Sequence, residues 1–152
     1  MLKCWTDGAA MPNPGRGAAA CVANLGDIQP TPEIPLVYER TVALGDNVSN
    51  NVAELAGIEL AVDLALELLA KNIVLRQVSI TTDSQYAAGV IGKGWKAKAN
   101  VAMVGQIRQK CKRLCDPTRQ LPCTLALGWE RRDFSPENKR VDQLAKELAQ
   151  IQ

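Results

Sequence analysis

Four acidic residues, Asp7, Glu54, Asp83 and Asp142, stand in four separate segments of the chain. An unpaired carboxylate is costly to bury, so a buried acid is usually neutralised, ion-paired or bound to a metal. Oxygen ligands favour Mg²⁺ or Mn²⁺. Two such ions, about 3.5–4 Å apart, are the usual arrangement for in-line displacement at phosphorus. The four acids therefore predict a divalent-metal site suited to phosphoryl chemistry.

Glu54 carries most of this prediction. Residues 50–71 have the pattern of an amphipathic helix, and Glu54 lies on its apolar side. At about 100° per residue, five apolar residues fall within about 60° of it, namely Ile58, Ala61, Ala65, Leu68 and Leu69. The other acids of the segment, Glu59, Asp63 and Glu67, project about 140°, 180° and 220° away and form a solvent stripe.

The other three acids stand at the ends or starts of predicted elements. Residues 2–7 have the alternating pattern of a strand, and Gly8 is expected to end it. Residues 78–83 show the same pattern and also end in Asp. In an open α/β sheet, ligand-binding groups gather at the carboxyl ends of parallel strands. Asp142 stands near the start of the last helix. Asp7 and Asp83 also suit turn or capping positions, and Asp142 also suits an ion pair with Lys146.

Length and composition indicate one domain covering residues 1–152. The chain is 47% apolar, and no apolar run is long enough to span a bilayer. The N-terminus has no signal pattern, so we expect a cytoplasmic protein, and a monomer. Five cysteines without secretory context indicate reduced thiols. Cys111, Cys115 and Cys123 suggest zinc only weakly, because a paired C-x-x-C and a fourth ligand are missing.

The chain contains no histidine, and this excludes several kinds of chemistry. Nucleophiles activated by histidine and histidine-ligated zinc or haem sites are impossible. No phosphate-binding glycine loop is present, since the segment at 13–17 lacks the lysine and the helix that should follow. Hard-metal chemistry at carboxylates remains, without a small-molecule cofactor.

Hydrophobic patterns predict five strands and four helices. The strands are expected at 2–7, 18–24, 36–44, 73–82 and 121–129, and the helices at 50–71, 84–91, 99–115 and 136–150. Ser135 and Pro136 form an N-cap and first-turn pair for the last helix. Hairpin-linked strands followed by βα alternation predict an α/β fold with a mixed five-stranded sheet flanked by helices, its first three strands antiparallel.

Several motifs, in order along nearly the whole chain, resemble type 1 ribonuclease H. WTDGAAMPNPGRGAAACV resembles the first hairpin of that family, SNNVAELAGIELAV its first helix, ITTDSQYAAGV its fourth strand and the next helix, and SPENKRVDQLAKELA its closing helix. The resemblance implies the ribonuclease H-like fold. It also implies hydrolysis of the RNA strand of RNA/DNA hybrids with two Mg²⁺ ions, leaving 3′-hydroxyl and 5′-phosphate ends, with Mn²⁺ as a possible substitute.

The same resemblance implies roles for individual residues. Asp7, Glu54, Asp83 and Asp142 become the metal-binding catalytic acids. Asn and Gln amides, each donor and acceptor, suit the 2′-OH groups of a hybrid's shallow minor groove. Asn13 also suits a turn, and Ser49 and Asn50 also suit a helix cap. The implied substrate-binding residues are Gly8, Asn13, Ser49, Asn50, Asn51, Ser84, Gln85 and Arg132.

Two features depart from well-known members of that family. A short segment, GKGWKAKAN, replaces a long basic handle; its lysines and Trp95 suit either phosphate contacts or a solvated loop. Arg132 stands where many members carry a histidine that is thought to assist product release. Arginine cannot exchange a proton near neutral pH, so its role would be electrostatic.

The net charge of +2 does not by itself indicate a protein that binds nucleic acid. We expect a basic groove drawn from residues 93–98, 108–113 and 131–140, next to a metal site that changes the local sign. Two other functions stay open, a non-catalytic hybrid-binding module and another nuclease or resolvase of the same fold. Four retained acids argue against a pure binder, since they would repel phosphates.

Overall fold

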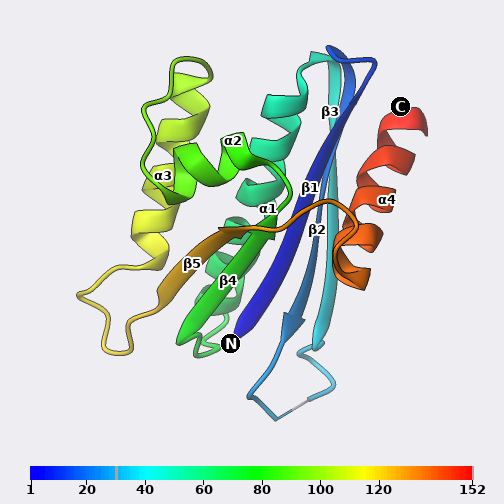
Figure 1. Cartoon of the computed structure of the whole chain (residues 1–152). Coiled ribbons are helices and arrows are strands. Elements are labelled where there is room, and N and C mark those ends of the chain that lie inside the picture. Colours follow the sequence, from blue (N-terminus) through cyan, green and yellow to red (C-terminus); the bar gives the residue numbers. More distant parts are fainter. Residues whose placement is uncertain (30, 152) are drawn as a thin grey trace.

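The structure is a computed structural model that describes residues 1–29 and 31–151 (Figure 1). Its centre is a five-stranded sheet in the order β3-β2-β1-β4-β5. The strands are β1 (Leu2–Met11), β2 (Gly15–Leu25), β3 (Val37–Val48), β4 (Gln77–Thr82) and β5 (Thr124–Trp129). β1, β2 and β3 pair antiparallel, whereas β4 runs parallel to both β1 and β5. The predicted mixed sheet is confirmed.

Helices cover both faces of this sheet. They are α1 (Asn50–Ala70), α2 (Gln85–Ala87) with the π-helical turn η1 (Ala88–Gly92), α3 (Val101–Leu114) and α4 (Pro136–Ile151). Figure 1 shows α1 and α3 on one side of the sheet and α4 on the other. Among the described residues, no helix combines the length and apolar character needed to cross a membrane.

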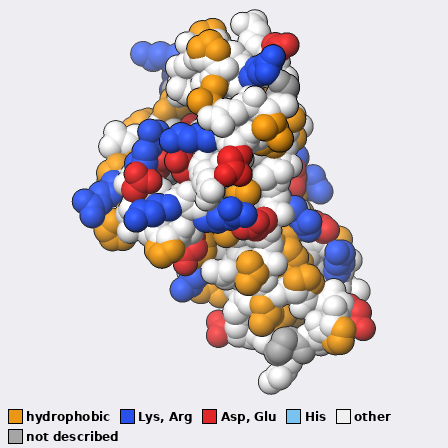
Figure 2. Space-filling model, turned by 90° about the vertical axis from the view of Figure 1, so that its right-hand side faces the viewer, with side chains coloured by type: hydrophobic (Ala, Val, Ile, Leu, Met, Phe, Trp, Pro, Cys, Tyr) orange, Lys and Arg blue, Asp and Glu red, His pale blue; other side chains and the backbone are white. Residues whose placement is uncertain are grey.

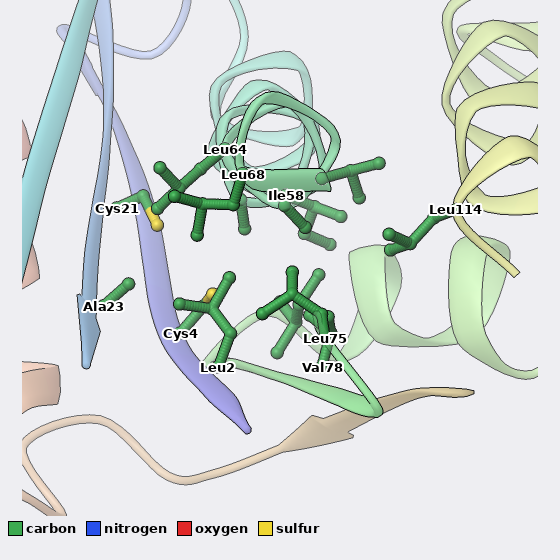
Figure 3. Packing of buried hydrophobic residues seen from close by; sticks show 14 of the residues in the cluster. Leu2, Cys4, Cys21, Ala23, Ile58, Leu64, Leu68, Leu75, Val78 and Leu114 are labelled. Carbon is green, nitrogen blue, oxygen red and sulfur yellow. The ribbon is translucent and has the colours of Figure 1, made fainter. Parts of the chain in front are cut away.

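The two faces are packed with side chains of different size. The α1 face holds the larger core, with Leu2, Ile58, Leu68 and Val78 in contact across α1 and the strands (Figure 3). The α4 face is lined mainly by small residues, including Ala9, Ala18, Ala20, Ala145 and Ala149. Small side chains let α4 lie close to the strands, which brings its first turns near β1.

β1 is longer than the sequence predicted, and Gly8 does not stop it. Its antiparallel pairing with β2 continues as far as Met11 and Arg16, whereas its parallel pairing with β4 ends at Thr6 and Thr82. β3 likewise continues to Val48, because its pairing with β2 does. Asp7 therefore lies inside a strand, at the point where the neighbouring strand on one side has stopped.

Serine side chains cap three helices. Ser49 Oγ accepts a hydrogen bond from Val52 N at 3.2 Å, and Ser84 Oγ accepts one from Ala87 N at 3.1 Å. The predicted cap of the last helix is confirmed, since Ser135 Oγ accepts from Asn138 N at 3.1 Å. Each cap satisfies an N–H that a helix start leaves without an intrahelical partner.

Candidate active site

Two glycines bring α1 into close contact with β1. A Cβ atom on Gly8 would lie 2.1 Å from the carbonyl carbon of Ala53, and one on Gly57 would lie 2.9 Å from the backbone oxygen of Asp7. Only glycine permits backbones to approach this closely. Glu54 stands between the two contacts on α1, so this packing holds its side chain beside Asp7. Gly57 was not among the residues predicted from the sequence, although a glycine inside a helix, costing about 1 kcal/mol relative to alanine, is a signal for such packing.

The acids reach the site from opposite faces of the sheet. Asp7 projects from the same face of β1 as Trp5 and Ala9, which pack in the α4 layer. Glu54 comes from α1 on the other face. Asp7 and Glu54 meet because β4 stops at Thr82, so no strand separates them at this level of the sheet. Asp83 is the first residue after the end of β4.

Three carboxylates form a tight cluster. Asp7, Glu54 and Asp83 each place an oxygen within 4.8 Å of the others. Asp7 is 3% exposed, Glu54 7%, and the Asp83 side chain 4%. Within the described part of the chain, the buried Oε2 of Glu54 has no hydrogen-bond partner. Buried acids close together, one with an unpartnered oxygen, fit a divalent cation by their donor chemistry.

Burial and mutual repulsion change the acidity of this cluster. Burial, followed by the charges of Glu54 and Asp83, raises the pKa of Asp7 from 3.8 to about 11. Burial raises the pKa of Glu54 from 4.5 to about 8. Adjacent carboxylates cannot all ionise at neutral pH without a compensating charge. A bound cation would supply that charge and would lower the pKa of both acids.

Asp142 lies next to Asp7 but outside the tight cluster of the other three acids. Its Oδ2 lies 3.0 Å from Lys146 Nζ, so the alternative ion pair predicted from the sequence is present. Its side chain is 17% exposed, and the hydrogen bond that it accepts from protonated Asp7 contributes to the raised pKa of Asp7. Asp142 and Lys146 also line the hollow of about 380 Å³ that Glu54 and Asp83 border. It therefore belongs to the rim of the site.

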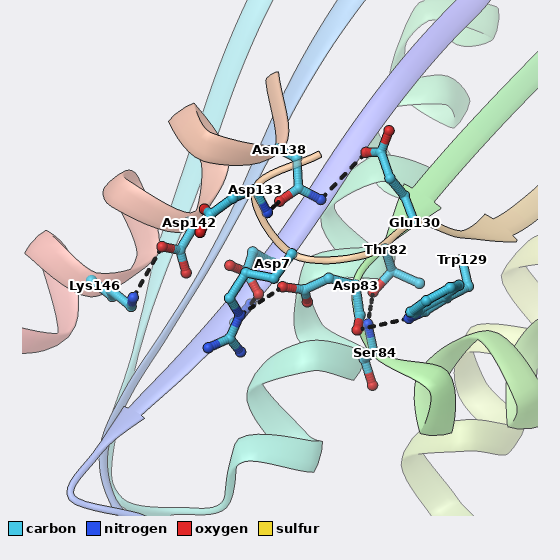
Figure 4. A network of polar contacts seen from close by, with 12 residues as sticks. Asp7, Thr82, Asp83, Ser84, Trp129, Glu130, Asp133, Asn138, Asp142 and Lys146 are labelled. Carbon is cyan, nitrogen blue, oxygen red and sulfur yellow. Dashed lines mark hydrogen bonds and ion pairs between the residues drawn. The ribbon is translucent and has the colours of Figure 1, made fainter. Parts of the chain in front are cut away.

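The end of β5 and the segment that follows it each contact Asp83 (Figure 4). Arg132 Nε lies 3.3 Å from Asp83 Oδ2. The negative charge of Asp83 is the main reason that the pKa of Arg132 is raised. The indole Nε1 of Trp129 donates to the Asp83 backbone oxygen at 3.0 Å. Trp129 was not among the residues predicted from the sequence, because nothing local links it to an acid 46 positions earlier.

Asn138, also missed, holds that segment in place. It is 2% exposed, its Oδ1 accepts from Asp133 N at 3.0 Å, and its Nδ2 donates to Glu130 Oε2 at 3.4 Å. A sequence signal did exist: Asn138 occupies the same helical stripe as Val141, Ala145 and Ala149. A polar residue on an apolar stripe usually has a specific partner.

The predicted asparagines first serve the fold. Asn13 Oδ1 accepts from Asn50 N at 3.0 Å, and Asn50 Oδ1 accepts from Ala10 N at 3.1 Å. These bonds join the β1–β2 hairpin to the start of α1. The turn position of Asn13 and the cap role of Ser49 are therefore confirmed. The cap role is not confirmed for Asn50, which is the first residue of α1 and whose side chain bonds to β1 instead.

The hollow brings together a subset of the predicted contacts. Gly8, Asn50, Asn51, Ser84 and Arg132 line it together with the acids. Gln85 lies in a neighbouring hollow with Lys93, Trp95 and Trp129. Asn13 is exposed and Ser49 half-buried, and neither lines the hollow of the acids.

The three basic stretches do not form one groove. Arg108 donates to the backbone oxygens of Val90 and Trp95, and Lys110 pairs with acids of α1. Arg140 lies 2.9 Å from Glu39 on the α4 side, where Figure 2 shows basic and acidic side chains interspersed. The prediction was wrong in this respect, because side chains near in sequence face different layers. Lys93, over the ring of Trp95 at 5.6 Å, stays close to the site.

The cysteines form no metal centre in the described part of the chain, where the one cluster of potential ligands is the carboxylate triad. All five thiols are free. Burial raises the pKa of Cys111 to about 11, so this thiol stays protonated at neutral pH.

Comparison with known proteins agrees with this geometry. The family model described as RNase H matches residues 1–150. The chain belongs to the RNase H family. It is 29% identical to Ribonuclease H of Novosphingobium aromaticivorans, covering 97% of this chain and 96% of that protein, and 28% identical to that of Aeromonas salmonicida, covering 97% and 89%. These matches identify a hydrolase of the ribonuclease H class.

Solved structures of RNase H proteins share the fold. LC11-RNase H1 in complex with an RNA/DNA hybrid matches with a TM-score of 0.72 at 21% identity, covering 97% of this chain and 95% of that one. RNase H1 from the halophilic archaeon Halobacterium salinarum matches with a TM-score of 0.69 at 20% identity, covering 98% and 97%. The predicted RNase H-like α/β fold is thereby confirmed.

Proposed function

We propose that this RNase H family member cleaves the RNA strand of RNA/DNA hybrids at the Asp7, Glu54 and Asp83 cluster, leaving 3′-hydroxyl and 5′-phosphate ends. The observation that carries the proposal is the cluster itself, with oxygens within 4.8 Å and an unpartnered buried Glu54 Oε2. The hybrid bound by LC11-RNase H1 supports the choice of substrate.

Asp7, Glu54 and Asp83 would hold the cofactor, with Asp142 as a fourth ligand from the rim. We propose two Mg²⁺ ions, with Mn²⁺ as a substitute, because all the donors are hard oxygens. When bound, the ions supply Lewis acidity to the attacking water and to the leaving 3′ oxygen. The chain's own contribution is to fix the carboxylates, through the two glycine contacts, before substrate arrives.

Polar groups around the hollow would recognise the RNA strand. Asn50, Asn51 and Ser84 line it, and the Gly8 backbone borders it without a side chain. Gln85, from the adjacent hollow, would extend these contacts along the minor groove. Asn13 and Ser49 would act indirectly, by positioning Asn50 and the start of α1.

Arg132 would bind phosphate rather than move a proton. Its side chain is 64% exposed at the mouth of the site, while its Nε contacts Asp83. Asp83 carries negative charge that a bound cation would compensate, which would free the guanidinium for the substrate. We further propose that residues 1–152 act as one monomeric domain; a cytoplasmic location stays a prediction.

The test is cleavage of end-labelled RNA/DNA, RNA/RNA and DNA/DNA duplexes, with Mg²⁺ or with a chelator. Of the three duplexes, we expect only the RNA/DNA hybrid to be cleaved, and only when Mg²⁺ is present. The products should carry 3′-hydroxyl and 5′-phosphate ends. Binding without cleavage would support the non-catalytic module. Preferred cleavage of DNA would support another nuclease of this fold.

Selectivity for the 2′-OH has its own test. One deoxynucleotide placed at the scissile position should reduce cleavage there by the cost of unsatisfied polar partners, about 1–3 kcal/mol. Base sequence should matter little. Equal cleavage of the substituted and all-ribo strands would show that Asn50, Asn51 and Gln85 serve the fold alone.

A further inference from the structure

An exposed aromatic surface lies beside the acid cluster, and its exposed ring faces have no part in the chemistry proposed above. We define it as the loop platform: Trp129, Arg131 and Phe134. Trp129 is 49% exposed and Phe134 is 59% exposed, and Arg131 Cζ lies 5.1 Å from the centre of the Phe134 ring. Together with Thr81 and Glu130 they line a hollow of about 450 Å³.

The loop platform is held in a fixed position. The indole of Trp129 is bonded to the Asp83 backbone, and Glu130 N donates to Thr82 O at 2.9 Å. Phe134 N bonds to Arg131 O at 3.3 Å, which closes the turn that carries both side chains. A surface ordered before binding loses less conformational freedom when a ligand arrives.

The charge of the loop platform favours an anionic ligand. Arg131 forms no ion pair within 4.0 Å among the residues that the structure describes. Glu130 also lines the hollow, and its Oε2 accepts hydrogen bonds from Ser135 Oγ at 3.1 Å and from Asn138 Nδ2, so this carboxylate is held toward the start of α4. Flat rings beside an unpaired guanidinium match a nucleotide, which combines a flat base with a phosphate.

We propose that the loop platform binds an unpaired nucleotide of the RNA strand next to the hybrid, its base stacked on the aromatic rings and its phosphate beside Arg131. The inference rests on the proposed function, and deepens it. Bases inside a duplex are already stacked on each other, whereas unpaired bases have free faces. The RNA strand is favoured because Trp129 and Arg132 both touch Asp83, so the platform adjoins the strand that is cut.

The experiment compares binding of a blunt hybrid with binding of the same hybrid carrying four unpaired nucleotides. The extension is placed on the 5′ or 3′ end of either strand, and Kd is measured by fluorescence anisotropy with a chelator present, so that nothing is cut. We expect an RNA extension at one end to tighten binding by about fivefold or more, the scale of one stacked base. A DNA extension should have little effect.

Variants then assign the effect to the loop platform. Phe134→Ala should remove most of the preference for the extended hybrid. Phe134→Leu should do the same, because a side chain of similar bulk without an aromatic face cannot stack on a base. Arg131→Ala should reduce the preference severalfold. Binding of the blunt hybrid should stay within about twofold. Arg40→Ala is the matched control, because it removes a guanidinium that lies over a ring on β3, far from the site. Trp129 is left unchanged because its indole supports Asp83.

Three results would overturn the inference. The first is equal Kd values for the blunt and the RNA-extended hybrid. The second is a Phe134→Ala variant that loses affinity for both hybrids equally. The third is a Phe134→Leu variant that keeps the full preference for the RNA-extended hybrid. Cleavage of the blunt hybrid with Mg²⁺ tests the proposed function separately. If that cleavage fails while the RNA-extension preference depends on Phe134, the nucleotide site stands and the nuclease proposal falls.

Discussion

Glu54 and Asp142 border the same hollow from opposite faces of the sheet, yet their surroundings differ. Glu54 is buried in a glycine-lined contact and keeps an oxygen without a hydrogen-bond partner. Asp142 is more exposed and already has Lys146 at 3.0 Å. An acid with its own cation is satisfied without a ligand, whereas Glu54 is not. From this contrast we predict a ranking of the four acids, in which loss of Asp7, Glu54 or Asp83 costs more activity than loss of Asp142.

The largest expected effect tests this ranking directly. Asp7→Asn, Glu54→Gln and Asp83→Asn keep size and remove charge, so cleavage of hybrids should fall at least about a hundredfold, the scale of other preorganised electrostatic groups. Asp142→Asn should cost less than any of the three. Steady-state kcat/KM with Mg²⁺ measures all four. A parental rate for Asp83→Asn would refute the catalytic assignment, and equal losses in all four variants would refute the ranking.

Stability of the metal-free protein should depend on pH through the same acids. Because the folded pKa of Asp7 is raised to about 11 and that of Glu54 to about 8, the folded chain binds more protons than the unfolded chain above pH 4. Stability is therefore fully present below the ordinary pKa values and declines as pH rises toward the folded ones.

Thermal melts with a chelator, between pH 5 and pH 9, measure this slope. Asp7→Asn should flatten it and leave the midpoint at neutral pH equal or higher, and saturating Mg²⁺ should also flatten it. Asp142→Asn serves as the control and should keep most of the slope. A parental slope in Asp7→Asn would show that the buried acids are not its cause.

A smaller effect is expected at Arg132, which contacts the cluster from the solvent side. Arg132→Ala should slow cleavage about tenfold or less, the scale of one phosphate contact. No histidine titrates in this chain, so activity should rise from about pH 6 to about pH 9 without a step near pH 6.5. Arg132→Lys should restore part of the rate, since it keeps the charge. Loss as complete as in Asp7→Asn would place Arg132 among the catalytic residues.

The smallest effect concerns the partner of Asp142. Lys146→Ala removes an exposed i,i+4 ion pair, so unfolding stability should change by less than about 1 kcal/mol. It also removes the cation that competes for the Asp142 carboxylate, so Mg²⁺ affinity, measured by isothermal titration calorimetry, should rise a few fold. Weaker Mg²⁺ binding instead would mean that Lys146 positions Asp142 for the metal.

The sequence by itself determined the order and type of the main elements, and it determined which side of α1 Glu54 occupies. The 3.6-residue period of 50–71 predicted α1 and placed Glu54 on its apolar side, and the alternation of 2–7 predicted the start of β1. These features are local, since side-chain direction follows from backbone geometry within a few residues.

Tertiary structure decided which groups meet. β1 continues past Asp7 because β2 pairs with it, while β4 ends and opens the space that Glu54 enters. Asp142 lies at the rim because α4 packs on the face opposite to α1, and Trp129 supports Asp83 across 46 positions of sequence. Such contacts depend on the packing of distant segments, which no local pattern encodes, so the acids were recognisable from the sequence but their unequal environments were not.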